Sequence, residues 1–523
     1  DWLKLCPARP SPDPPSSASA RAARRSRTYS AMAAGLPSPA SRPAGLAPLS
    51  ADAGAALPAN PTPSSSSSRV RTPLMRPLPP APPPELLFKW LVAAIREGGA
   101  FVSSKLIRAE VPPLNVPGLV AQEGLESLEQ IIRVPFALQI SHQLARERNP
   151  GLMEAVARCG SEVRIECPEV VAFVAALLAE LEGRGWCRVG ADTDELVGSA
   201  SWLDLFVGLQ LGCDFGWMPH VTLIGDEERR SLFQPSPEVH NADWNHDAFR
   251  DAHEAILGAA PELCESIDVS RFVQAYLVLL TRTFSCQSAH RFVPVADMMN
   301  HSCSPNATWT FDEQGDFIVK TVRPIQPGEE VLISYGRDKS NVRLFRTYGF
   351  TLPPQEEPCS SFRVWPSQAY PIYTEFLPEK ARRRTLDLET SRIDSTTREA
   401  LVACASYGCD PAAFLRALCR HFRKRYEQDP LLAPWLKRLA KRREDMPWSA
   451  EWWETSGDVE DKEPWLRRCA VRVKMSEYLC LTAHLEALDI ESGAVLPLHC
   501  ITAAVDLEAL LSKALQAARA PPK

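Results

Sequence analysis

The chain has 523 residues, of which 45% are hydrophobic and 23% charged, which is enough apolar material to bury at least one large core. Its net charge of −6 argues against a dedicated nucleic-acid binder, which usually has a basic balance. No stretch approaches the roughly 18 consecutive apolar residues of a transmembrane helix. The 15 cysteines include no C-x-x-C pair, so we expect reduced thiols and no structural zinc site.

Residues 1–84 differ in composition from the rest of the chain. They hold 19 of the 47 prolines, and ten Lys and Arg against three Asp. Such a segment cannot bury enough apolar surface to fold, so it is predicted to be a disordered, basic, Pro/Ala/Ser-rich tail. Residues 20–30 lack acids and are rich in Arg, Ala and Ser, as in an organelle transit peptide; the alternative is an ordinary basic tail. The compartment stays open between cytoplasm or nucleus and plastid.

The first half of the body is predicted to be largely helical. A helix should begin at Pro84 and end at Gly98, because proline favours a first helical position and glycine a helix end. Residues 119–121 and 131–134 have the β-branched and apolar character of short strands. From about 136 to 280 the apolar residues recur at helical spacing.

The pattern changes between residues 290 and 350. Residues 307–311 and 317–322 alternate like two strands of a hairpin around Gly315. A turn over residues 325–329 leads to a strand over 330–335, and a helix is predicted from Lys339 to Tyr348, ended by Gly349. From about residue 360 onward the chain reads as helix.

Two motifs in this region carry chemical information. Residues 297–306 read DMMNHSCSPN and residues 327–336 read PGEEVLISYG. In this order, with a hairpin between them, they resemble the two C-terminal signatures of SET-domain protein methyltransferases. Residues 341–350, NVRLFRTYGF, are similar to a segment of the Rubisco large-subunit lysine methyltransferase subgroup, which also includes a histidine methyltransferase.

The resemblance implies an α+β fold. It consists of a β-rich SET core over residues 85–355, interrupted by a helical insert at about 140–280, and an all-helical C-terminal substrate-binding domain over 360–523. It also implies S-adenosylmethionine (SAM) as the cofactor and a protein with a lysine-bearing segment as the partner, without direct nucleic-acid or membrane binding. No metal is implied.

The resemblance also implies roles for individual residues. Tyr335 matches the catalytic tyrosine, and Tyr348 and Phe350 match aromatics that line the channel for the substrate side chain. The residues implied to bind the cofactor are Asn300, His301, Asp297, Arg282, Gly118 and Pro117. The arginine suits the methionine carboxylate because its fork-shaped guanidinium can bond both carboxylate oxygens.

These residue types suit methyl transfer from a sulfonium to an amine. The reaction needs alignment more than acid–base chemistry, and good alignment can supply about 7–11 kcal/mol. The acceptor lysine, with an ordinary pKa of about 10.4, must arrive neutral, and an apolar aromatic channel disfavours its charged form.

Three functions stay open at this point. The first is a lysine methyltransferase, and the second is a histidine methyltransferase. The third is a SET-derived binding module without catalysis, because the glycine-rich cofactor turn of the family is reduced here to Gly118 and the following LVA, with Asn115 in place of an acid. An acidic run at 451–463 and a divergent segment at 214–220 leave the substrate undetermined.

Overall fold

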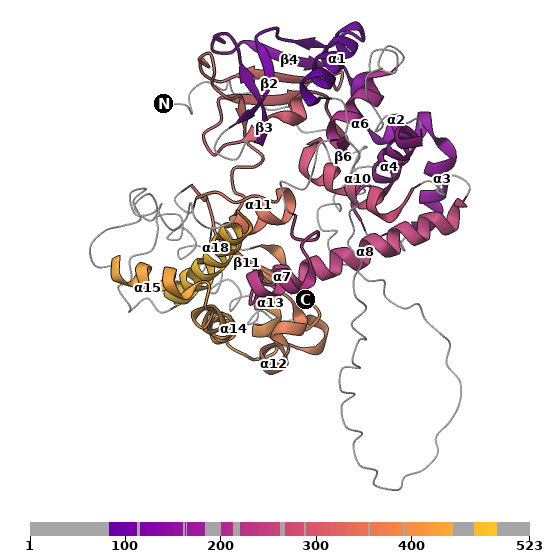
Figure 1. The fold of residues 1–523 in the computed structure, drawn as a ribbon. Helices are drawn as coiled ribbons and strands as arrows, with labels where there is room; N and C mark the ends of the chain where they lie inside the picture. The colour runs from indigo at the N-terminus through magenta and orange to yellow at the C-terminus, as the bar shows by residue number, and fades with distance from the viewer. Residues whose placement is uncertain are drawn as a thin grey trace, which may run out of the picture. The chain divides into compact units, whose positions relative to one another are not determined.

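The computed structural model describes residues 83–111, 116–160, 163, 165–183, 200–212, 220–261, 267–286, 289–353, 356–390, 394–442 and 465–488 (Figure 1). The predicted tail before residue 83, Asn115, most of the divergent segment at 214–220 and the acidic run at 451–463 lie outside these ranges. All the described residues belong to one compact unit.

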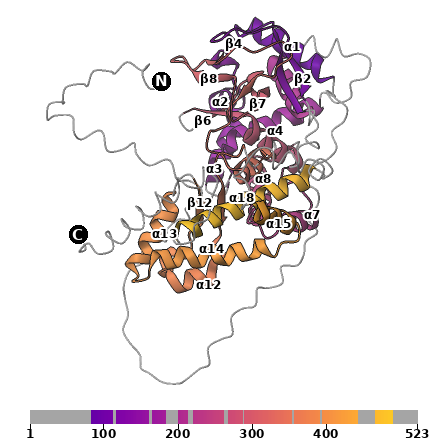
Figure 2. The same cartoon turned by 90° about the vertical axis from the view of Figure 1, so that its left-hand side faces the viewer.

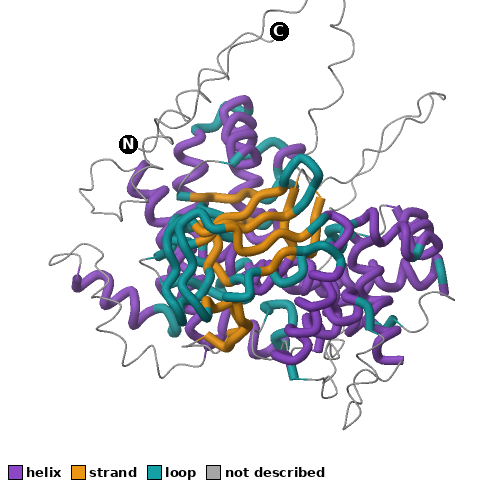
Figure 3. The backbone as a smooth tube through the Cα atoms, turned by 90° about the horizontal axis from the view of Figure 1, so that it is seen from above, coloured by secondary structure: helices purple, strands orange, loops and turns teal. Residues whose placement is uncertain are grey.

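The central element is a four-stranded sheet in the order β1-β4-β9-β8, in which neighbouring strands are antiparallel. The other strands form two-stranded pairs, β2 with β3, β5 with β6, β7 with β10 and β11 with β12. Figure 3 shows the strands gathered together with helices beside them. The strands are β1 (Phe101–Val102), β2 (Leu106–Val111), β3 (Val116–Ala121), β4 (Gln130–Val134), β5 (Thr283–Cys286), β6 (Ala289–Phe292), β7 (Asn300–His301), β8 (Ala307–Phe311), β9 (Phe317–Thr321), β10 (Leu332–Ile333), β11 (Ser361–Val364) and β12 (Leu386–Glu389).

The predicted hairpin is confirmed as β8 and β9. Gly315 has a φ of +82°, which side chains rarely allow, so glycine suits this turn. The next residue, Asp316, accepts hydrogen bonds from Arg133 of β4 at 2.8 and 3.1 Å. The hairpin is therefore joined to β4 both by strand pairing and by the Arg133–Asp316 ion pair.

Several of the described helices begin after a residue whose side chain caps them. α10, for example, begins after Asp268, whose side chain accepts a hydrogen bond from the Arg271 N–H, as an N-cap residue should. The helices are α1 (Pro84–Glu97), α2 (His142–Arg148), α3 (Pro150–Cys159), α4 (Pro168–Gly183), α6 (Trp202–Gly212), α7 (Asp226–Phe233), α8 (Glu238–Ala259), α10 (Val269–Arg282), α11 (Asn341–Tyr348), α12 (Pro366–Phe376), α13 (Ser395–Ser406), α14 (Pro411–Glu427), α15 (Ala433–Arg442) and α18 (Trp465–Leu488).

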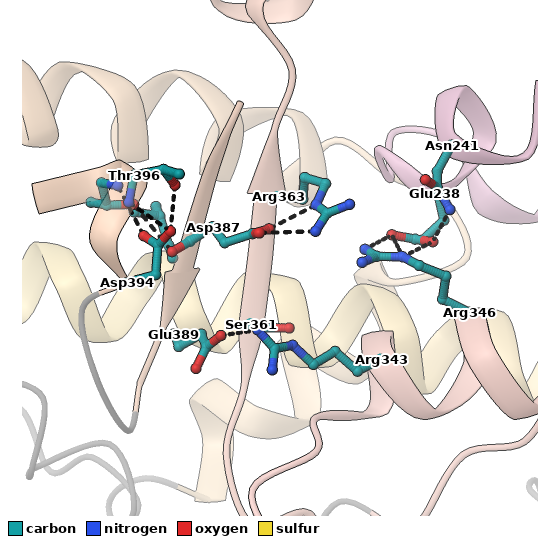
Figure 4. A network of polar contacts seen from close by, with 12 residues as sticks. Glu238, Asn241, Arg343, Arg346, Ser361, Arg363, Asp387, Glu389, Asp394 and Thr396 are labelled. Carbon is teal, nitrogen blue, oxygen red and sulfur yellow. Dashed lines mark hydrogen bonds and ion pairs between the residues drawn. The ribbon is translucent and has the colours of Figure 1, made fainter. Parts of the chain in front are cut away.

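The α+β class is confirmed, with two corrections to the predicted elements. The region after residue 360 is not all-helical, because β11 and β12 form an antiparallel pair within it. Arg363 of β11 donates two hydrogen bonds, of 2.7 and 2.9 Å, to the carboxylate of Asp387 on β12 and so links the two strands (Figure 4). The strand predicted over 330–335 is only Leu332–Ile333, because the flanking backbone bonds elsewhere.

Helix α18 is buried along most of its length and packs beside α14 (Figure 2). Its Glu477 accepts hydrogen bonds from Ser236, before α8, and from Tyr426 of α14, each at 2.8 Å. Beside it, Arg346 of α11 forms a bidentate ion pair with the fully buried Glu238 of α8 (Figure 4). These contacts join the helices that precede β5 to those that follow β10.

Glu357 is a second buried carboxyl, and it bonds a residue of α18. Its Oε1 accepts hydrogen bonds from the Asn341 N–H, at 2.6 Å, and from the Ser476 hydroxyl. Burial raises the pKa of Glu357 from 4.5 to about 8, because a charged carboxylate is poorly solvated there. Burial likewise raises the pKa of Glu477 to about 8.

The raised pKa of Glu357 predicts how stability depends on pH. Between pH 4.5 and about 8 the folded state holds a proton that the unfolded chain releases. This contribution to the free energy of unfolding is complete below pH 4.5, falls as the pH rises, and is lost above about pH 8. We expect Glu357→Gln, which stays neutral, to lose less stability over this range in urea unfolding followed by circular dichroism.

The neighbouring Glu356 is exposed, so Glu356→Gln is the matched control and should keep the wild-type pH dependence. The raised pKa of Glu477 acts in the same direction. The free energy of unfolding of Glu357→Gln should therefore still fall as the pH rises, but less steeply than that of the wild type. If the wild-type and Glu357→Gln curves run parallel, Glu357 is charged in the folded state.

Candidate active site

The two sequence motifs lie side by side as a parallel strand pair. β7 and β10 pair in a register that places Asn300 opposite Leu332. The buried Asn306 fastens the pair: its Oδ1 accepts a hydrogen bond from the Leu332 N–H, and its Nδ2 donates to the Glu330 carbonyl, both at 2.7 Å. Segments about thirty residues apart in the chain thus meet in a fixed register.

Tyr335, just after β10, lies in a cluster of aromatic rings. Its ring centroid is 4.7 Å from that of Tyr348, 5.3 Å from His301 and 6.3 Å from Phe350. The hydroxyl donates a hydrogen bond to the Met299 carbonyl at 2.8 Å, which fixes the position of its oxygen. The structure therefore brings together the tyrosine predicted to be catalytic and the two aromatics predicted to line the substrate channel.

His301 and Tyr335 are both held in their neutral forms. The Tyr335 N–H donates to His301 Nδ1 at 3.0 Å, so this ring nitrogen acts as an acceptor. Burial, assisted by the positive charge of Lys339, lowers the pKa of His301 to about 4. Burial raises the pKa of the Tyr335 hydroxyl well above its ordinary value. The aromatic cluster thus carries no charge of its own near neutral pH.

Asn300 is held from two sides. Its Nδ2 donates to Glu330 Oε1 at 2.7 Å and to the Pro117 carbonyl at 3.2 Å. A Cβ on Gly118 would lie 2.4 Å from Glu330 Oε1 and 2.9 Å from Asn300 Nδ2. A side chain at position 118 would therefore displace the Glu330 carboxylate and the Asn300 amide from the places where they bond each other.

Pro117 lies in strand β3, opposite Glu110 of β2. In this ladder Leu119 and Ala121 direct their backbone groups away from β2, toward Val331 and Glu329. Pro117 is in phase with them, so its missing N–H removes no hydrogen bond between β2 and β3. Its carbonyl is the group that meets Asn300.

Arg282 and Asp297 also lie together. Arg282 is the last residue of α10, and its Nη1 donates to the Asp297 backbone carbonyl at 3.0 Å. Asp297 is buried in a 3-10 helix over Ala296–Met298. Within the described ranges, no group of three or more His, Cys, Asp and Glu side chains is placed to hold a metal ion.

Three residues that the structure places at this site have no role that the sequence implies. Asn306 and Glu330 were within the quoted motifs, but their roles depend on contacts across the β7–β10 pair. Lys339, whose Nζ lies 5.6 Å from the centroid of the Tyr348 ring, had no sequence signal beyond its place as the first residue of the predicted helix, and it lies just before α11, which begins at Asn341.

Comparisons with known proteins show which family this part of the chain resembles. Residues 118–336 match the family model of the SET domain. The chloroplastic Rubisco large-subunit N-methyltransferase of Pisum sativum is 24% identical over 314 residues, which are 57% of this chain and 57% of that protein. The matched stretches of other curated relatives are shorter, so the chain spans little more than half, or less, of these relatives.

Solved structures show the fold over a larger part of the chain. A structure of Rubisco LSMT bound to AdoMet has a TM-score of 0.51 at 18% identity and covers 78% of this chain and 92% of its own. A structure of the SET domain of LSMT bound to lysine and AdoHcy has a TM-score of 0.53 at 16% identity, with the same coverage. The predicted resemblance to this subgroup is confirmed.

The contact at Gly118 gives a test of the site's packing. Gly118→Ala forces a methyl group against Glu330 and Asn300, and such overpacking costs about 1–3 kcal/mol. We expect the free energy of unfolding, measured with urea, to fall by this amount. The control is Gly124→Ala, because nothing lies within 4 Å of the added carbon; it should change stability by less than about 0.5 kcal/mol. Equal effects of the two variants would contradict the close approach.

Proposed function

On the premise that residues 118–336 form a SET domain, we propose that the chain is a SAM-dependent protein-lysine N-methyltransferase. The observation that carries the proposal is the neutral aromatic cluster of Tyr335, Tyr348 and Phe350 around His301, which follows Asn300 in strand β7. The solved relative with lysine and AdoHcy bound supports lysine as the acceptor.

The residues proposed to bind SAM have side chains that fit its chemistry. One guanidinium N–H of Arg282 donates to the Asp297 carbonyl. The fork-shaped guanidinium suits a carboxylate such as that of the methionine part of SAM. Asn300, His301 and Asp297 supply polar groups, and the Pro117–Gly118 segment packs against Asn300. When bound, SAM supplies a methyl group on a sulfonium, which is already a strong leaving group.

The residues of the cluster act by binding, orienting and excluding water. Tyr335 keeps its proton, because burial raises its pKa, and its oxygen is fixed by the Met299 carbonyl. A hydroxyl held in place before the substrate arrives pays no reorganisation cost during the reaction. Tyr348 and Phe350 exclude water from the acceptor amine, and this loss of hydration disfavours the ammonium form, so the amine loses its proton to solvent before it attacks.

We also propose roles for the two parts of the chain. Residues 85–355 form the SET domain with its insert at about 140–280, and residues 360–523 bind the protein substrate that carries the lysine. The buried contacts of α18 with α11 and with the segment before α8 support this proposal, because they hold the C-terminal region at a fixed position beside the helix that supplies Tyr348.

Loss of the Tyr335 hydroxyl is the first test. We expect Tyr335→Phe to bind SAM as the wild type does in calorimetry but to transfer methyl groups to proteins of a cell extract about 10²-fold more slowly, as for other preorganised hydrogen-bonding groups. The matched control is Tyr370→Phe, because Tyr370 is 59% exposed. Unchanged transfer by Tyr335→Phe would remove Tyr335 from the mechanism.

The identity of the acceptor separates the remaining functions. We expect hydrolysis of the methylated extract protein, followed by amino-acid analysis, to release methylated lysine. Release of methylated histidine would replace the proposal by the histidine methyltransferase. Absence of SAM binding by a folded sample would leave the SET-derived binding module.

A further inference from the structure

Lys339 lies in the turn between Tyr335 and helix α11. Its side chain runs along this turn: a Cβ built on Gly336 would lie 2.8 Å from Lys339 Cε and 3.2 Å from Cγ. Gly336 therefore leaves the room that the lysine stem occupies. At its end, Nζ lies 5.6 Å from the centroid of the Tyr348 ring, within cation–π range.

Within the described ranges the amine of Lys339 has no acidic partner, unlike the half-buried Lys105 and the buried Lys474. Lys105 pairs with Glu129 at 2.9 Å and Lys474 with Asp429 at 2.7 Å. Lys339 Nζ forms no ion pair and no hydrogen bond with any residue in the described ranges. Burial, together with the positive charge of Arg343, lowers its pKa, so its neutral form is more accessible than that of an exposed lysine.

The ring beneath this amine belongs to the proposed acceptor site. Tyr348 stacks against Tyr335 with centroids 4.7 Å apart, and Phe350 lies 6.0 Å from Tyr348. A lysine side chain has four rotatable bonds, so its amine can be moved by changes of rotamer alone. Rotations of this side chain can therefore carry its nitrogen from the Tyr348 ring toward Tyr335 with little backbone movement.

We propose that Lys339 is a methyl acceptor of the chain's own site. The inference rests on the proposed function, because it needs SAM as the methyl donor. The lone pair of neutral Nζ attacks the methyl carbon, the bond from that carbon to the sulfonium sulfur breaks, and the sulfur keeps the bonding electrons as a thioether. The methylated nitrogen is positively charged and can lose one of its protons to solvent.

The position of Lys339 also has a purely structural explanation, in which its ammonium only stabilises the Tyr348 ring by a cation–π contact. The variant Lys339→Arg separates the two, since arginine keeps a cation for the Tyr348 ring but offers no lysine amine. Lys320 on β9 is exposed, so Lys320→Arg is the matched control for methylation of accessible lysines.

The experiment incubates the purified full chain with SAM and locates added methyl groups by intact mass and peptide mass spectrometry. We expect methylation at Lys339, none at this position in Lys339→Arg, unchanged modification in Lys320→Arg, and loss of the Lys339 modification in Tyr335→Phe. The initial rate per molecule should not change with protein concentration, because the acceptor and the site belong to one chain.

The outcomes distinguish this inference from the proposed function. If the preparation methylates extract proteins but leaves Lys339 unmodified, the inference is wrong and the proposed function stands. Methyl groups spread equally over Lys320 and Lys339, or a rate that rises with protein concentration, would also overturn it. If a folded sample neither binds SAM nor transfers methyl groups, both fail.

Discussion

The parallel pairing of β7 with β10 is the constraint on which the site depends. It joins two motifs that neither helix nor hairpin contacts would bring together, and the buried Asn306 fixes its register through the Leu332 N–H and the Glu330 carbonyl. A shift by one residue would turn every side chain of a strand to the opposite face. Asn300 would then lose Glu330, and His301 would lose the backbone of Tyr335.

Burial gives the two sides of the site different electrostatic characters. On the acceptor side, Tyr335 is neutral because its charged form is poorly solvated, and so is the neighbouring His301, which is also proposed to bind the cofactor. On the proposed cofactor side, Arg282 and Asp297 lie close together, and Glu330 bonds Asn300. A charged cofactor and a neutral amine each need one of these environments, so the division is consistent with methyl transfer between them.

The buried carboxyls of Glu357 and Glu477 connect the C-terminal region to the rest of the fold. Glu477 is bonded by residues before α8 and on α14, while Glu357 is bonded by α11 and α18. Partly satisfied buried carboxyls would be costly, but each of these has hydrogen-bond donors from two parts of the chain. The helix that supplies Tyr348 is thereby held against the region proposed to bind substrate.

Local patterns in the sequence determined the elements and the identity of the motifs. Pro84 starts a helix, Gly315 permits a tight turn, and Gly349 ends α11 with a φ of +76°, because these residues act on their own backbone. Tertiary structure alone decided the contacts of Pro117 with Asn300, which are 183 residues apart, and the place of Lys339 on Tyr348. The β11–β12 pair was missed for the same reason: strands this short are stabilised by their partners and not by their own periodicity.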